Sequence, residues 1–342
     1  MATSFSSDFV SQAQPETKQK SDSAEIFQKN TKSSLKCYRC SKCDGFGCPN
    51  MIPGLGGVKD GKNFQLNVQG WQNLFSLAET SKKNFQINEI KISPQMLRCG
   101  PVTGAVENIG YSNEEDFYYP YLSNAFNNGL GLCVGDGCPD EKLQFGLNAI
   151  KKITEQNLQA ASSCTCINAY INAAFFLKPY PQENLLKRID FVSPYAEYIG
   201  IDIDSFNIKT MRNLVNLEKK SASQLLELKN HTQKKFVIKG IFTKEDIELV
   251  KQVKPHVAYI SNHGGRVETK TGSTADFLLE NASELKQYCS EIWIDGGIRT
   301  IRDIKTAIYY GASQIIIGRP LIRATFDNNY NNCIKTILSD NS

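Results

Sequence analysis

Eight short β-like runs alternate with longer helical patterns along most of this chain. The runs predict strands at Met96–Gly100, Leu130–Val134, Tyr170–Leu177, Tyr198–Asp202, Lys235–Lys239, His256–Ser261, Glu291–Asp295 and Gln314–Ile317. The stretches between them predict helices at Glu114–Asn127, Asp140–Glu155, Lys244–Gln252, Thr274–Cys289 and Ile301–Tyr310. Eight βα units over about 250 residues is the arithmetic of an α/β fold of the (β/α)8 TIM-barrel type.

A doubly wound open sheet is the alternative fold for the same alternation. That fold would carry a G-x-G-x-x-G fingerprint after its first strand. The segment after residues 96–100 contains no such fingerprint, so we favour the barrel.

The amino-terminal part of the chain differs from the rest in composition. Residues 1–36 are rich in Ser, Gln, Lys and Thr and poor in large apolar residues, which predicts a disordered tail. Residues 37–62 form a segment rich in Cys and Gly, and the barrel is expected over residues 63–342.

Four of the eleven cysteines cluster in that second segment, at Cys37, Cys40, Cys43 and Cys48. Their spacing, C-x2-C-x2-C-x4-C, approaches that of ferredoxin-type ligands and would suit either an Fe–S cluster or zinc. Four reduced thiols that bind no metal are the alternative. The remaining seven cysteines are expected to be reduced and to pack as small apolar residues.

Composition and charge narrow the class of protein. A hydrophobic fraction of 41% and a charged fraction of 22% fit a folded globular chain and exclude wholesale disorder. The net charge of +4 is too small to indicate a nucleic-acid partner. The sequence has no run of about 18 apolar residues, so no membrane span is expected. No secretory core stands near Met1 and the first residues carry acids, which predicts a cytoplasmic protein.

Polar residues follow the last four predicted strands at the point where each strand ends. In a barrel these four ends converge on one face, where active sites lie. Glycines and arginines after the last two strands suit a phosphate site, because glycine lets backbone N–H groups approach and arginine adds charge-assisted bonds. The residues expected there are Asp295, Gly296, Gly297, Arg299, Gly318 and Arg319. Two tight turns with surface arginines are the alternative.

His263 is one of three histidines and stands at the end of the sixth predicted strand, followed by two glycines and Arg266. A histidine at a barrel strand end favours a general base. The planar guanidinium of Arg266 suits a substrate carboxylate.

These segments, read together, resemble the FMN-dependent α-hydroxy-acid oxidase and dehydrogenase family, which includes glycolate oxidase and lactate oxidase. The resemblance covers roughly residues 80 to 325 and rests on four segments in order. They are Ile-Lys239-Gly240, Ser261-Asn-His-Gly-Gly-Arg266, Asp295-Gly-Gly-Ile-Arg299 and Gly318-Arg319-Pro320. The chain looks closest to a shorter bacterial branch, which also opens with four cysteines and a Pro-Gly-x-Gly-Gly stretch, here residues 53–57.

The resemblance implies an FMN cofactor and the oxidation of a small, lactate-like 2-hydroxy acid. It does not identify the electron acceptor, and it is compatible with a homo-oligomer. His263 would be the base and Arg266 would hold the carboxylate. Lys239 would stabilise reduced flavin beside N1 and the C2 carbonyl. Asp204 would pair with His263 and raise its pKa. Further flavin contacts are expected from Pro101, Asp136, Lys178 and Ser261.

The sequence departs from the family in four places. Lys178 stands where the oxidases have a tyrosine, and Asp202 stands where the family often has a threonine. A second substrate arginine and an amino-terminal substrate tyrosine have no clear counterpart. Two alternatives therefore stay open: a flavin barrel of another class, such as an isomerase resembling type 2 isopentenyl-diphosphate isomerase, and a non-catalytic flavin or Fe–S electron carrier.

Overall fold

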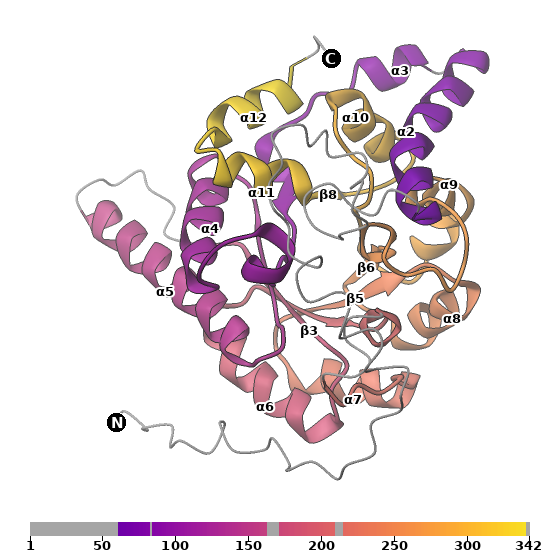
Figure 1. Cartoon of the computed structure of the whole chain (residues 1–342). Helices are drawn as coiled ribbons and strands as arrows, with labels where there is room; N and C mark the ends of the chain where they lie inside the picture. Colours follow the sequence, from indigo (N-terminus) through magenta and orange to yellow (C-terminus); the bar gives the residue numbers. More distant parts are fainter. Residues whose placement is uncertain (1–60, 83, 163–170, 209–214, 340–342) are drawn as a thin grey trace, which may run out of the picture. The chain divides into compact units, whose positions relative to one another are not determined.

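The structure is a computed structural model that describes residues 61–82, 84–162, 171–208 and 215–339 of the 342. Within this part the chain forms the predicted (β/α)8 barrel (Figure 1). The predicted tail, the cysteine cluster and the boundary between residues 36 and 37 lie outside the described residues, so these stay predictions.

Eight parallel strands make the barrel, and each pairs with its sequence neighbour. They are β1 Leu97–Cys99, β2 Leu132–Gly135, β3 Ala173–Leu177, β4 Tyr198–Asp202, β5 Lys235–Ile241, β6 Val257–Ile260, β7 Glu291–Ile294 and β8 Gln314–Ile317. β1 pairs with β8, and a bridge between Arg98 and Gly131 joins β1 to the start of β2. The ring of strands is thereby closed.

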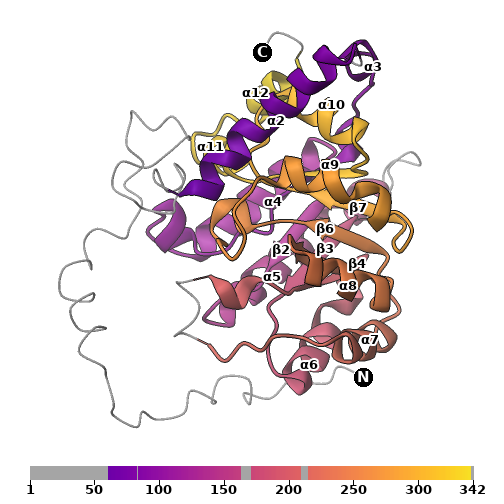
Figure 2. The same cartoon turned by 90° about the vertical axis from the view of Figure 1, so that its right-hand side faces the viewer.

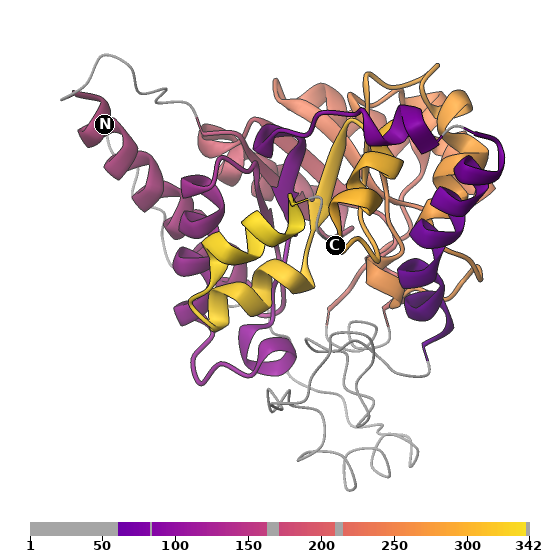
Figure 3. The same cartoon turned by 90° about the horizontal axis from the view of Figure 1, so that it is seen from above.

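The helices surround the strands and agree with the predicted ones where a prediction was made, except at their ends. They are α2 Lys62–Thr80, α3 Asn84–Asn88, α4 Tyr118–Asn127, α5 Glu141–Ser162, α6 Gln182–Val192, α7 Ala222–His231, α8 Lys244–Val253, α9 Thr274–Leu285, α10 Ile301–Tyr309, α11 Arg319–Phe326 and α12 Tyr330–Ile337. None of the helices in the described part combines the length and apolar character that a bilayer crossing requires. α2 is not part of the βα ring and lies against α9 and α10 (Figures 2 and 3).

One strand differs from its prediction in a way that matters for the site. β5 was expected to end at Lys239, but it continues to Ile241 with a shift of register against β6 between these two residues. Gly240 lies at the shift with φ 98°. A bulge of this kind re-aims the neighbouring side chain, here Lys239.

The barrel interior is packed at its amino-terminal end, which leaves the carboxyl-terminal end for a site. The buried guanidinium of Arg98 stacks on the rings of Trp293 (4.2 Å) and Tyr198 (4.8 Å). Phe176 and Tyr259 continue this aromatic layer toward the carboxyl ends of the strands. Arg98 therefore has a structural role in the floor of the barrel.

Candidate active site

A cavity lies at the carboxyl ends of the strands, and most of the residues predicted for the site line it. These are Pro101, Asp136, Lys178, Lys239, His263, Arg266, Asp295, Gly296, Gly297, Arg299, Gly318 and Arg319. Asp204 and Ser261 are not among the lining residues. Each contacts a residue that is: Asp204 pairs with His263, and the Ser261 hydroxyl donates a hydrogen bond to Asp295 at 2.9 Å.

The loop after β6 presents His263 through an unusual run of backbone conformations. His263, Gly264 and Gly265 have φ values of 55°, 62° and 89°. Asn262 closes this turn with its side chain, which accepts a hydrogen bond from the Gly265 N–H at 2.9 Å. A left-handed conformation at a histidine is uncommon and costs free energy, so the turn is held by its surroundings.

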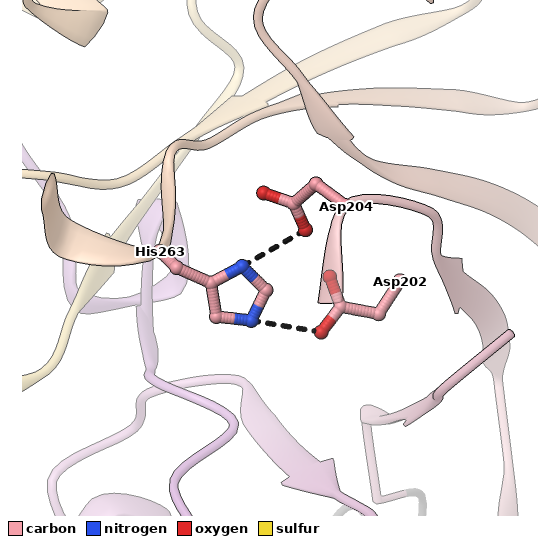
Figure 4. A group of neighbouring side chains, drawn as sticks. All are labelled: Asp202, Asp204 and His263. Carbon is pink, nitrogen blue, oxygen red and sulfur yellow. Dashed lines mark ion pairs between the residues drawn. The ribbon is translucent and has the colours of Figure 1, made fainter. Parts of the chain in front are cut away.

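The imidazole of His263 lies between two carboxylates (Figure 4). Nδ1 is 2.8 Å from Asp204 Oδ1, and Nε2 is 3.1 Å from Asp202 Oδ2. Burial would lower the pKa of His263, but Asp202 and Asp204 together raise it. Burial and the charge of Asp202 raise the pKa of Asp204 to about 6.

Lys239 completes a buried group of four charges. Its Nζ is 2.8 Å from Asp202 Oδ1 and 3.4 Å from His263 Nε2. Burial would raise the pKa of Asp202, but His263 and Lys239 hold it below its usual range. Asp202, Asp204 and His263 also lie close enough to surround a metal ion. The Lys239 ammonium already contacts Asp202, so it occupies the place beside that carboxylate where a metal cation would bind.

Three partly buried arginines line another part of the cavity wall. They are Arg266, Arg299 and Arg319, and burial lowers the pKa of each. The pKa of Arg319 falls furthest, because Arg266 and Arg299 add like charge to the effect of burial. Gathering three cations in one partly buried wall is costly, and an anionic ligand would offset that cost.

Two glycines of this wall, Gly297 and Gly318, differ in what a side chain at their position would contact. A Cβ on Gly318 would meet nothing within 4 Å, although Gly318 lines the cavity at the start of α11. A Cβ on Gly297 would lie 1.9 Å from the backbone oxygen of Asn67. Gly318 thus leaves open space for a ligand, whereas Gly297 allows the close approach of α2. The donor set and the open space at Gly318 fit the phosphate of an FMN.

Lys178 and Asp136 lie together at the ends of β3 and β2. Lys178 Nζ is 3.2 Å from Asp136 Oδ1 and donates a short hydrogen bond to the Asp136 backbone oxygen. Arg188 Nη1 lies 3.7 Å from the same carboxylate. The pKa of Asp136 is raised because it is fully buried, and both cations oppose that shift. Both residues line the cavity, as predicted, but they face each other within its wall.

The sequence reasoning missed a stripe of polar residues on α2. Asn67 and Asn262 exchange hydrogen bonds through their side-chain amides, at 2.7 and 3.1 Å. Trp71 Nε1 donates to the Gly296 oxygen at 2.8 Å, and Asn63 donates twice to the loop after His263, at 2.8 Å each. The three residues recur every four positions and so share one face of the helix. α2 therefore fixes both the His263 loop and the turn after β7.

Replacing Asn67 with alanine is expected to lower the free energy of unfolding by about 1 to 3 kcal/mol, because Asn262 and the Thr274 N–H lose buried partners. Asn73→Ala is the matched control, since Asn73 is exposed on the same helix, and it should change stability by less than about 0.5 kcal/mol. Urea denaturation measures both. Equal stability of the two variants would contradict the role given to the stripe.

Comparison with known proteins finds matches over part of the chain. Residues 179–331 match the family model described as FMN-dependent dehydrogenase. 2-Hydroxyacid oxidase 2 of Bos taurus is 38% identical over 91 residues, which are 27% of this chain and 26% of that protein. L-lactate dehydrogenase (cytochrome) of Saccharomyces cerevisiae is 32% identical over 102 residues, 29% of this chain and 17% of that protein. The aligned regions thus span about a quarter or less of these relatives' lengths.

Solved structures share the fold over a longer stretch. A mandelate oxidase variant with (S)-mandelic acid superposes with a TM-score of 0.55 at 16% identity, covering 81% of this chain and 83% of that one. Mandelate oxidase with 3,3-difluoro-2-hydroxy-3-phenylpropionic acid gives a TM-score of 0.54 at 14% identity, covering 82% and 83%. The protein is a (β/α)8 barrel of the kind these oxidases have. The match to the FMN-dependent dehydrogenase model covers residues 179–331, which is less than half of the chain.

Proposed function

We propose that this protein is an FMN-dependent oxidoreductase that converts a small 2-hydroxy acid into the 2-oxo acid. One observation carries the proposal: a histidine set between two carboxylates faces the same cavity as a partly buried cluster of arginines. The family match over residues 179–331 and the names of the relatives support the same reaction class.

The residues divide into a cofactor group and a substrate group. Arg299, Gly318 and Arg319 would hold the FMN phosphate, and Lys239 would lie beside the flavin ring. Arg266 would bind the substrate carboxylate with its planar guanidinium. His263 would then accept the proton of the α-hydroxyl group.

The oxidation must remove two electrons and two protons from the hydroxy acid. A bound flavin supplies the acceptor for the electron pair that leaves with the α-hydrogen. The protein's part is to orient the acid by its carboxylate and to hold the hydroxyl proton on His263, where Asp204 stabilises the resulting imidazolium. A small substrate such as lactate is the acid we favour.

The two alternatives from the sequence have less support. An isomerase acting on a diphosphate has no need for a carboxylate-binding guanidinium beside the base, and Arg266 lines the same cavity as His263. A non-catalytic carrier has no need for a histidine held in a costly left-handed conformation.

A spectrum of the purified protein tests the proposal. We expect a yellow protein that releases FMN on denaturation and whose flavin is bleached without oxygen by one member of a panel of 2-hydroxy acids. Recovery of FAD, or a colourless protein that FMN does not reconstitute, would overturn the cofactor assignment. A flavin that no hydroxy acid bleaches would overturn the reaction.

The cysteine segment, which lies outside the described residues, is expected to be dispensable for flavin binding. The residues assigned above to FMN lie between Pro101 and Arg319 in the sequence, well after this segment. Changing Cys37, Cys40, Cys43 and Cys48 to serine should therefore leave the FMN content unchanged. Metal analysis of protein purified without oxygen should find iron or zinc in the parent and neither in the variant. A parent without either metal would leave the thiols as free thiols.

A further inference from the structure

Asp202 is the second carboxylate that contacts His263, the candidate base, and its contacts differ from those of Asp204. Asp202 is the last residue of β4 and lines the cavity, whereas Asp204 contacts the other side of the imidazole. Its two oxygens have separate partners: Oδ1 is 2.8 Å from Lys239 Nζ and Oδ2 is 3.1 Å from His263 Nε2. The side chain is buried, so these contacts are shielded from water.

The pairing has a consequence for the proton on His263. A neutral imidazole has one N–H and one lone pair, whereas an imidazolium has two N–H donors. Both nitrogens of His263 lie within 3.1 Å of a carboxylate oxygen. A neutral ring would therefore point its lone pair at one of the carboxylates, whereas the imidazolium suits both. A lone pair on Nε2 would suit only the Lys239 ammonium, 3.4 Å away.

The balance of charge among Asp202, Asp204, Lys239 and His263 also favours the imidazolium form of His263. Asp202 and Asp204 carry two negative charges, and Lys239 with a protonated His263 carries two positive ones. The other charged groups around His263 are Asp295 after β7 and, across the cavity wall, Arg266 and Arg319. Lys239 opposes protonation of His263, but the two carboxylates outweigh it and raise the pKa of the ring.

We propose that Asp202 is a positioning residue that holds His263 in the imidazolium form in the resting protein and at the same time neutralises Lys239. His263 then becomes a base only after its proton has left to solvent, so turnover should rise with pH through this ionisation. The part that concerns turnover rests on the proposed function. The resting protonation state does not depend on it.

NMR titration of the purified protein with isotope-labelled histidine tests the inference directly. The chain has three histidines, so His231→Gln and His256→Gln assign the His263 signals by elimination. Wild-type His263 is expected to be an imidazolium at pH 7. In Asp202→Asn its midpoint should fall by an amount equal to at least a tenfold, or about 1.4 kcal/mol, change in proton affinity.

Asp190→Asn is the matched control. Asp190 Oδ1 lies 2.7 Å from Nε2 of the partly exposed His231, so the change removes the same kind of contact elsewhere and should leave the His263 midpoint where it was. A neutral His263 at pH 7 in the wild type, or a midpoint that Asp202→Asn does not move, would overturn the inference. If the variant fails to fold, the protonation state of His263 in the wild type at pH 7 decides the test.

Two further readouts separate this inference from the proposed function. In Asp202→Asn loaded with FMN, the flavin potential should become more positive, because Lys239 is no longer neutralised and can stabilise negative charge beside it. With a proven substrate, the acid limb of the kcat/KM profile should move to lower pH. If no hydroxy acid is oxidised but the NMR midpoint shifts, the proposed function fails and the assignment of Asp202 stands. If the midpoint stays unchanged in an active enzyme, the assignment of Asp202 fails and the proposed function stands.

Discussion

Replacing His263 with asparagine is expected to lower turnover of the hydroxy acid by at least about 100-fold, the scale of losing a general base. The imidazole is the one group in the described cavity wall that lies between two carboxylates, at 2.8 and 3.1 Å, and that can both accept the hydroxyl proton and be stabilised when it does. Anaerobic bleaching of the flavin by a proven substrate, followed by stopped flow, measures the step.

The FMN content of the variant should match that of the parent, because the arginines assigned to the phosphate are unchanged. His231→Asn is the control, since His231 pairs with Asp190 on the surface and should keep full activity. If His263→Asn bleached its flavin at the parent's rate, the role of base would have to pass to another residue. A variant that loses its flavin would instead place His263 in the cofactor site.

The strand-end residues were predictable because a barrel brings its carboxyl ends together whatever the details of packing. Lys239 and Asp295 stand directly after apolar runs, and His263 stands three residues after the end of one. The structure places all three around one cavity. The alternation that predicts the strands is itself local, so it can be read from a single sequence.

Contacts between elements were not predictable in the same way. Asn63 and Asn67 are polar positions on α2, and a polar residue on a helix is ordinarily expected to be exposed. They are buried because both side-chain amides form hydrogen bonds with the loop after β6, about 200 residues further along the chain. The bulge at Gly240 could not be predicted from the sequence either. It depends on the side chain of Asp204, which would lie 2.5 Å from a Cβ at position 240. Asp202 drew attention only as a departure from the family.

A pair of glycine substitutions separates the ligand site from the scaffold that carries it. Gly318→Ala is expected to lower the stability of the flavin-free protein by about 1 kcal/mol at most. A Cβ there meets nothing within 4 Å, and the backbone angles, φ −102° and ψ −89°, lie only a little outside the right-handed helical region. FMN affinity should nevertheless fall at least about tenfold, because the methyl group takes space that the phosphate would use. Thermal unfolding without flavin and fluorescence titration with FMN measure the two effects.

Gly297→Ala is expected to act mainly on stability. Its Cβ would lie 1.9 Å from the Asn67 backbone oxygen, and φ is 79°, so both the close approach of α2 and the left-handed backbone are lost. The free energy of unfolding should fall by about 2 to 5 kcal/mol, the sum of a left-handed penalty and overpacking. If Gly318→Ala bound FMN as tightly as the parent, the open space beside α11 would not be where the phosphate lies. A stable Gly297→Ala would show that α2 can move away, and the His263 loop would then depend on it less than its hydrogen bonds indicate.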